Sequence, residues 1–130
     1  MFHFTVQPRF SETDGLGHIN NTVLPVWFEE ARTDLFRIFN PSLAMSSWNL
    51  ILKRFDVEFV AQIWREYPVE IETVIEKIGT TSLTVVQRAL QRSEPVAVGR
   101  TWLVYFDYQT HKPAPIPDDI REKLLPHLTE

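Results

Sequence analysis

The chain has 130 residues, a length that fits a single domain, and we expect one domain over residues 1–130. Its formal net charge of -4 at pH 7 argues against a nucleic-acid partner, which needs a concentrated basic face. There is no cysteine, and this excludes disulfides, thiolate metal ligands and a cysteine nucleophile. No apolar stretch approaches the ~20 residues that span a bilayer, and residues 1–9 lack the pattern of a signal peptide. We therefore expect a cytoplasmic protein that does not enter a membrane.

The N-terminal third begins with a strand and continues into a helix. Residues 2–10 alternate well enough for a first strand, and residues 11–22 form a turn-rich segment with two of the chain's four glycines. From residue 22 to residue 39 apolar side chains recur at helical spacing, at Leu24, Phe28, Ala31, Leu35 and Ile38. This pattern predicts one long, mostly enclosed helix. Asn21 or Thr22 is expected to cap it, and Asn40 and Pro41 to end it.

The remainder of the chain has the pattern of a sheet. We place strands over residues 50–62, 68–78, 82–92 and 96–108, and residues 79–81 and 93–95 are typical of hairpin connections. The strands should therefore run antiparallel. A short C-terminal helix is expected over residues 118–128, capped by Asp118 or Asp119. The predicted class is α+β, with an antiparallel sheet of about five strands wrapped around one long helix.

The segment before the long helix holds the side chains best suited to chemistry. Asp14, His18, Asn20 and Asn21 place a carboxylate, an imidazole and two amides within eight residues. The free amides at a helix start can stabilise an oxyanion, and an aspartate beside them can attack a carbonyl or take a proton from water. The residues alone leave a structural role open, because Asp-Gly is a common turn and Asn-Asn-Thr a common cap. The four histidines are scattered, so we expect no metal site.

This segment resembles the hotdog-fold acyl-CoA thioesterases of the 4-hydroxybenzoyl-CoA thioesterase type. The family pattern is similar to T/D-D-x-x-G-H-x-N-N followed by F-E-x-A-R on a helix, and here it is carried by residues 13–21 and 28–32. Weaker similarities follow at residues 78–83 and 113–121, in the family's order. Two departures are visible. Leu24 stands where many relatives have tyrosine, and Pro25 follows it at the helix start.

The resemblance implies a hotdog fold, an acyl-CoA substrate, no cofactor, and an active site at the interface of a homodimer or homotetramer. It implies that Asp14 is the nucleophile or general base and that His18 is the second catalytic residue. Further residues are implied to bind substrate, namely Gly17, Asn20, Asn21 and Glu30. For Glu30 we keep open a plain surface role, solvated or paired with Arg37.

Three other functions stand beside acyl-CoA hydrolysis. An acyl-carrier-protein thioesterase would use the same site with a different partner surface. A non-catalytic acyl-CoA-binding protein would have no need of the Asp14 carboxylate. Hotdog hydratases also pair aspartate with histidine, but usually at another spacing and with a proline inside the motif, so the short step from Asp14 to His18 favours hydrolysis. The sequence does not identify the acyl group.

Overall fold

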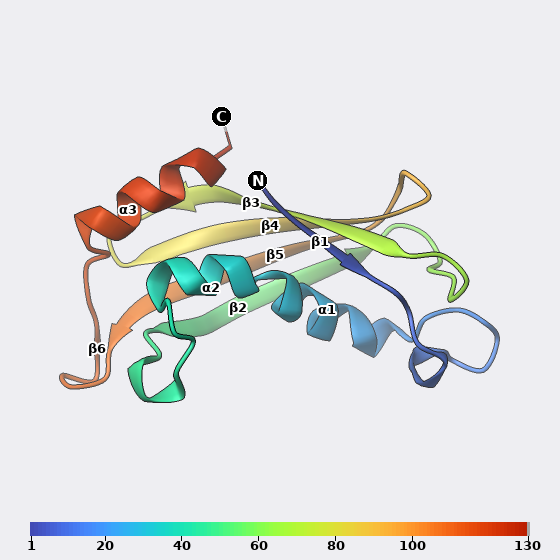
Figure 1. The fold of residues 1–130 in the computed structure, drawn as a ribbon, viewed down its shortest axis with the longest axis horizontal. Helices are drawn as coiled ribbons and strands as arrows, with labels where there is room; N and C mark the ends of the chain where they lie inside the picture. Colours follow the sequence, from blue (N-terminus) through green and yellow to red (C-terminus); the bar gives the residue numbers. More distant parts are fainter. Residues whose placement is uncertain (130) are drawn as a thin grey trace.

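A computed structural model describes residues 1–129, and its central feature is one antiparallel sheet that curves along the helical segments (Figure 1). The strand order is β1-β3-β4-β5-β2, and a short β6 pairs with β5. The strands are β1 (Phe2–Val6), β2 (Leu50–Phe59), β3 (Val69–Ile78), β4 (Ser82–Gln91), β5 (Glu94–Asp107) and β6 (Lys112–Pro113). The helices are α1 (Leu24–Ala31), α2 (Thr33–Phe39) and α3 (Asp118–Leu124). This arrangement confirms the predicted α+β hotdog fold.

Several predicted boundaries differ from those observed. The first strand ends at Val6, two residues before Pro8, and a 3-10 turn follows at Phe10–Glu12. Strand β2 ends at Phe59. The cap of α3 is Pro117, and neither Asp118 nor Asp119 supplies a capping side chain. The two-residue strand β6 has too little pattern to be recognised in the sequence.

The predicted long helix consists of two segments that meet at Arg32. In a continuous helix the Arg32 amide would donate to the Phe28 carbonyl, but it donates instead to Glu29 O at 3.0 Å. The Phe28 carbonyl is satisfied by the side chain of Gln87, whose Nε2 lies 2.9 Å from it. A side chain from β4 has therefore replaced one helical hydrogen bond, and the expectation of an unbroken helix was wrong at this residue.

The apolar side of the two helical segments packs against the sheet. Their buried side chains are Leu24, Trp27, Phe28, Ala31, Leu35 and Phe39. Strand β3 alternates between the two faces of the sheet, with Val69, Ile71, Thr73 and Ile75 buried. Gly99 on β5 allows a close approach of the helix to the sheet, because a Cβ atom there would lie 2.9 Å from the Phe28 ring. Among residues 1–129 no helix combines the length and apolar character needed to cross a membrane.

One edge of the sheet carries apolar side chains that the helices leave uncovered. Leu52, Phe55 and Phe59 on β2 are 48%, 40% and 47% exposed. Their partners across the strand pair are Leu103, Thr101 and Ala97, which are all buried beneath the helices. Directly opposed residues of an antiparallel pair point to the same face. The three β2 side chains therefore lie on the helix side of the sheet, beyond the reach of α1 and α2.

Candidate active site

A tight loop before α1 brings the predicted catalytic pair together at one end of the molecule (Figure 1). The Asp14 amide donates to His18 O at 2.8 Å, and Thr13 and Ile19 form an antiparallel bridge just outside this contact. Gly15 and Gly17 have φ values of +90° and +88°, a conformation that side chains with a Cβ rarely adopt. The two glycines thus provide the turn that returns His18 to Asp14.

The two oxygens of the Asp14 carboxylate have different surroundings. Oδ1 accepts a hydrogen bond from the Leu16 amide at 2.8 Å, which fixes the side chain over its own turn. Oδ2 lies 3.7 Å from His18 Nδ1, close enough for an ionic contact but longer than a hydrogen bond. The Asp14 and His18 side chains are 34% and 23% exposed. One oxygen is therefore anchored, while the other faces the imidazole and remains open to a ligand.

His18 is held by the segment that follows β2. Its ring meets Trp64 edge to face, with centroids 4.4 Å apart, and the two residues also form a backbone bridge. The Ile19 amide donates to Ile63 O at 2.8 Å. Gln91 binds both the amide and the carbonyl of Trp64, at 2.9 and 2.6 Å. The site loop is thus fixed to the sheet through residues 63–64, a relationship that sequence spacing does not reveal.

Glu12 is a positioning residue that our sequence analysis missed. Its side chain is only 10% exposed, and Oε2 accepts a hydrogen bond from Trp27 Nε1 at 2.9 Å. Its other oxygen, Oε1, accepts from the Arg9 amide at 2.8 Å, and its carbonyl accepts from the Asn20 amide at 2.8 Å. Glu12 therefore ties the loop to α1. The available signal in the sequence was its place beside the Asp14 motif. Because a glutamate is rarely buried without partners, its burial in the structure marks it as a positioning residue.

The helix start leaves fewer free amides than the sequence suggests. Asn20, and not Asn21 or Thr22, supplies the capping side chain. Its Oδ1 accepts from the Thr22 amide at 3.0 Å and caps the 3-10 turn Asn21–Val23, which leads directly into α1. The Val23 amide donates to Asn20 O at 3.0 Å, and Pro25 has no amide hydrogen. The Asn21 amide takes part in none of the hydrogen bonds found within residues 1–129. It is the donor at this turn that a ligand can use.

Glu30 lies apart from Asp14 within one chain. It stands nine residues beyond Asn21 along the helical segments, which corresponds to roughly 13 Å of rise. Its side chain is exposed and lines a pocket further along the helix with Glu29. Arg37, which we considered as its partner, pairs with Asp34 at 3.0 Å. The remaining predicted residues, from Asp14 to Asn21, do come together in one loop.

The possible metal-ligating side chains of the described residues are histidines and carboxylates, since the chain has no cysteine. Among residues 1–129 no three His, Cys, Asp or Glu side chains stand together so that they could hold a metal ion. The two carboxylates nearest the loop have other partners, since Glu12 binds Trp27 and Asp14 binds the Leu16 amide.

Comparison with known proteins places this chain in a family. The model of the thioesterase-like superfamily matches residues 8–124, which is most of the chain. The chain belongs to the thioesterase-like superfamily. This membership supports thioester hydrolysis as its chemistry.

Individual relatives agree with the superfamily match. A predicted thioesterase from Bacillus stearothermophilus is 44% identical, with a TM-score of 0.96 over 99% of this chain and 97% of the other. A thioesterase from Thermus thermophilus, complexed with coenzyme A and Zn, is 28% identical, with a TM-score of 0.84 over 94% and 90%. The Bacillus subtilis protein YsmA is 26% identical over 125 residues, covering 95% of this chain and 85% of its own.

Proposed function

We propose that the protein hydrolyses an acyl-CoA thioester to a free carboxylic acid and CoA, with Asp14 as general base or nucleophile. The observation that carries the proposal is the Asp14–His18 loop at the start of α1, in a chain of the thioesterase-like superfamily. The sequence pattern further resembles the 4-hydroxybenzoyl-CoA type within that superfamily. The solved thioesterase with bound coenzyme A supports CoA as the carrier.

As general base, Asp14 takes a proton through Oδ2 from a water molecule that attacks the thioester carbonyl. The carbon–sulfur bond then breaks, and the CoA thiolate leaves and takes up a proton. As nucleophile, Asp14 instead forms a mixed anhydride that water hydrolyses in a second step. Both routes need an anchored and accessible carboxylate. The Leu16 hydrogen bond to Oδ1 and the open Oδ2 meet this need.

Negative charge that develops on the carbonyl oxygen needs a donor nearby. The Asn21 amide lies at the positive end of the helical segment and has no partner within residues 1–129. His18 sits beside Asp14 and can orient the thioester or donate to it through its ring nitrogens. We assign these two groups to the polarised carbonyl, with Gly17 and Asn20 shaping the loop around it.

A cavity beside the helix start offers room for the substrate. Its volume is about 540 Å³, within the range of small-molecule sites. It is lined by Asn21, Leu24 and Ile19 on one side and by Phe59, Val60, Ala61, Gln62 and Ile63 on the other. The cavity extends from Asn21 to the end of β2, and Asp14 and His18 are not among its lining residues. An acyl group lying there would have its carbonyl at the end nearest the helix start.

We further propose that the functional unit is a homodimer or a tetramer built from it. The apolar row of Leu52, Phe55 and Phe59 is exposed on the helix side of an edge strand. Such an edge has unpaired backbone groups as well as apolar side chains, and a second copy can cover both. Because Phe59 also lines the cavity at the helix start, this pairing would bring the partner close to the active site.

The central test measures thiol release from purified protein on a panel of short, long and aryl acyl-CoA substrates. The same acyl groups on acyl-carrier protein form the second arm. Turnover of acyl-CoA is expected, and a preference for the carrier-protein arm would replace the proposed substrate with the alternative one. Saturable acyl-CoA binding without turnover in either arm would establish a non-catalytic binding protein and contradict hydrolysis.

A further inference from the structure

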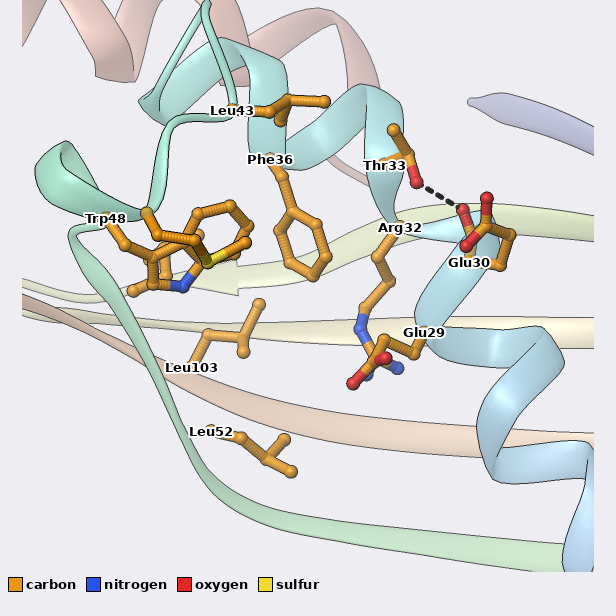
Figure 2. Close-up of a pocket in the computed structure, with 11 residues that line it drawn as sticks. Glu29, Glu30, Arg32, Thr33, Phe36, Leu43, Trp48, Leu52 and Leu103 are labelled. Carbon is orange, nitrogen blue, oxygen red and sulfur yellow. Dashed lines mark hydrogen bonds between the residues drawn. The ribbon is translucent and has the colours of Figure 1, made fainter.

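A second pocket lies about two helical turns from the start of α1 and has a buried cation in its wall (Figure 2). Its volume is about 410 Å³. It is bounded by Phe36, Leu43 and Trp48 on one side and by Leu52 and Leu103 of the sheet on the other. These walls are apolar, and the space accepts on the order of ten carbon-sized groups.

Arg32 extends into this pocket from the break between the helices, and it is only 5% exposed. Its Nη1 donates to Gln87 Oε1 at 3.0 Å and to Thr101 Oγ1 at 3.3 Å. Its Nε is enclosed and lacks a hydrogen-bond partner within the described chain. Neither hydrogen bond of the guanidinium uses Nη2. One edge of the group is thus satisfied by the sheet, and the Nε–Nη2 edge is not.

The charge of Arg32 is also uncompensated at close range. No carboxylate within residues 1–129 comes within 4.0 Å of the guanidinium. Burial lowers the pKa of Arg32 to about 10, and the charge of nearby Glu29 raises it only in part. Glu29 is exposed at the pocket mouth, where water screens it. A buried cation without a partner is costly, and an anion brought by a ligand would relieve that cost.

We propose that this pocket binds the carboxylate of an apolar organic acid, with Nη2 of Arg32 as its anchor, since Nη2 is neither hydrogen-bonded to the chain nor enclosed. A carboxylate at Nη2 forms a charge-assisted hydrogen bond, which is stronger than a hydrogen bond between neutral groups. The hydrocarbon part of the acid lies against Phe36, Trp48 and Leu103. The carboxylate has two sources, a free acid or the remote end of a dicarboxylic acyl group.

The site does not depend on the proposed hydrolysis, because Asp14 takes no part in it. The test titrates octanoate into the full-length protein by calorimetry, with 1-octanol as the uncharged ligand of equal chain length. Octanoate is expected to bind at least tenfold more tightly than octanol. Asp14→Asn should leave this binding unchanged. Equal affinities for the two ligands would overturn the proposal.

Two substitutions test the anchor in opposite directions. Arg32→Lys keeps a charge but has a single nitrogen donor on a shorter side chain, which cannot both bind the sheet and reach the ligand, so octanoate affinity should fall about tenfold, to the level of octanol. Glu29→Gln removes the competing negative charge at the mouth and should strengthen octanoate binding severalfold. The exposed Glu29 makes this second variant informative even where Arg32→Lys does not fold. Unchanged octanoate affinity in Glu29→Gln, or in a folded Arg32→Lys, would contradict the anchor.

A kinetic arm separates the two sources of the carboxylate. Octanoyl-CoA is compared with the thioester of the same length that carries a carboxylate at its far end. If the acyl group is the source, Arg32→Lys lowers kcat/KM for the dicarboxylic substrate alone. If the free acid is the source, Arg32→Lys weakens octanoate binding and leaves the ratio of the two kcat/KM values unchanged. Absence of turnover on either thioester would count against the proposed hydrolysis and leave the octanoate result to decide the pocket.

Discussion

Gln87 Nε2 donates to the Phe28 carbonyl oxygen at 2.9 Å, and so a sheet side chain occupies the position of a helical amide. The same Gln87 accepts from Arg32 through Oε1 at 3.0 Å and also donates to Thr73 Oγ1 at 3.1 Å. This one buried side chain therefore links the helix break, the cation in the pocket and two strands. The break at Arg32 and the orientation of its guanidinium have a common cause.

We expect Gln87→Leu to destabilise the protein by about 2–4 kcal/mol. The substitution keeps the volume but leaves the Phe28 carbonyl and Arg32 Nη1 without this partner, and each buried unsatisfied group costs roughly 1–3 kcal/mol. Urea unfolding measures the change. Gln62→Leu is the control, because Gln62 is exposed, and it should alter stability by less than about 0.5 kcal/mol. Equal effects in the two variants would show that the buried network contributes little.

The close contact between Gly99 and Phe28 gives a second stability prediction. A Cβ atom at residue 99 would stand 2.9 Å from two ring carbons of Phe28, so Gly99→Ala should cost about 1–3 kcal/mol by overpacking. Phe28→Leu should recover part of this loss in the double variant, because the smaller side chain makes room. Thermal unfolding of the single and double variants measures the coupling. If the two substitutions change the stability of the double variant by the sum of their separate effects, the added Cβ does not press on the Phe28 ring, and the backbone at residue 99 shifts to make room instead.

The antiparallel run of β3, β4 and β5 could be predicted because the strands alternate and the turns are marked, whereas the place of β2 beside β5 could not. Val69, Ile71 and Ile75 carry this pattern clearly in β3. The break in the helix could not be predicted, since the apolar spacing continues through Arg32 and the competing group, Gln87, is 55 residues away. Helical periodicity shows which face of a helix is buried. It does not show where a backbone hydrogen bond within the helix is missing.

The candidate site was predictable in part, because only some of its contacts are local in the sequence. Asp14 and His18 are close in sequence, and the two glycines between them make their approach a local matter. Trp64 and Gln91 were missed, because their contacts with the loop depend on how the sheet folds back. The cap was placed one or two residues late, since Asn20, Asn21 and Thr22 all suit that position by residue type.

Dimer formation through the β2 edge can be tested with one charge. We expect Phe55→Glu to shift the protein from dimer to monomer in analytical ultracentrifugation, because the substitution places a carboxylate in the apolar row. Leu125→Glu is the matched control, since Leu125 is 55% exposed but lies far along the chain from β2. It should leave the association unchanged. A wild-type protein that is monomeric and fully active at assay concentrations would remove the dimer from the proposal.

For His18 we expect replacement by alanine to lower acyl-CoA turnover by roughly tenfold to a thousandfold, the range of one acid–base or orienting contact. The imidazole also packs on Trp64, so the melting temperature must be measured beside the rate. His3→Ala is the control, because His3 is exposed on β1. Loss of stability in proportion to activity would assign His18 a structural role. Unchanged kinetics and stability would make it a bystander.

The most direct test of the mechanism is Asp14→Asn. Asparagine keeps a carbonyl oxygen at the position of Oδ1, so the hydrogen bond from the Leu16 amide survives and stability should change little. It cannot attack the thioester or take a proton from water, and turnover should therefore fall at least ~100-fold. Binding of an inert acyl-CoA analogue should be nearly unaffected. Asp34→Asn, which alters only a surface pair with Arg37, is the matched control and should retain full activity. If Asp14→Asn hydrolysed acyl-CoA at close to the wild-type rate, neither the base route nor the nucleophile route would stand, and the anchored carboxylate would be a turn residue only.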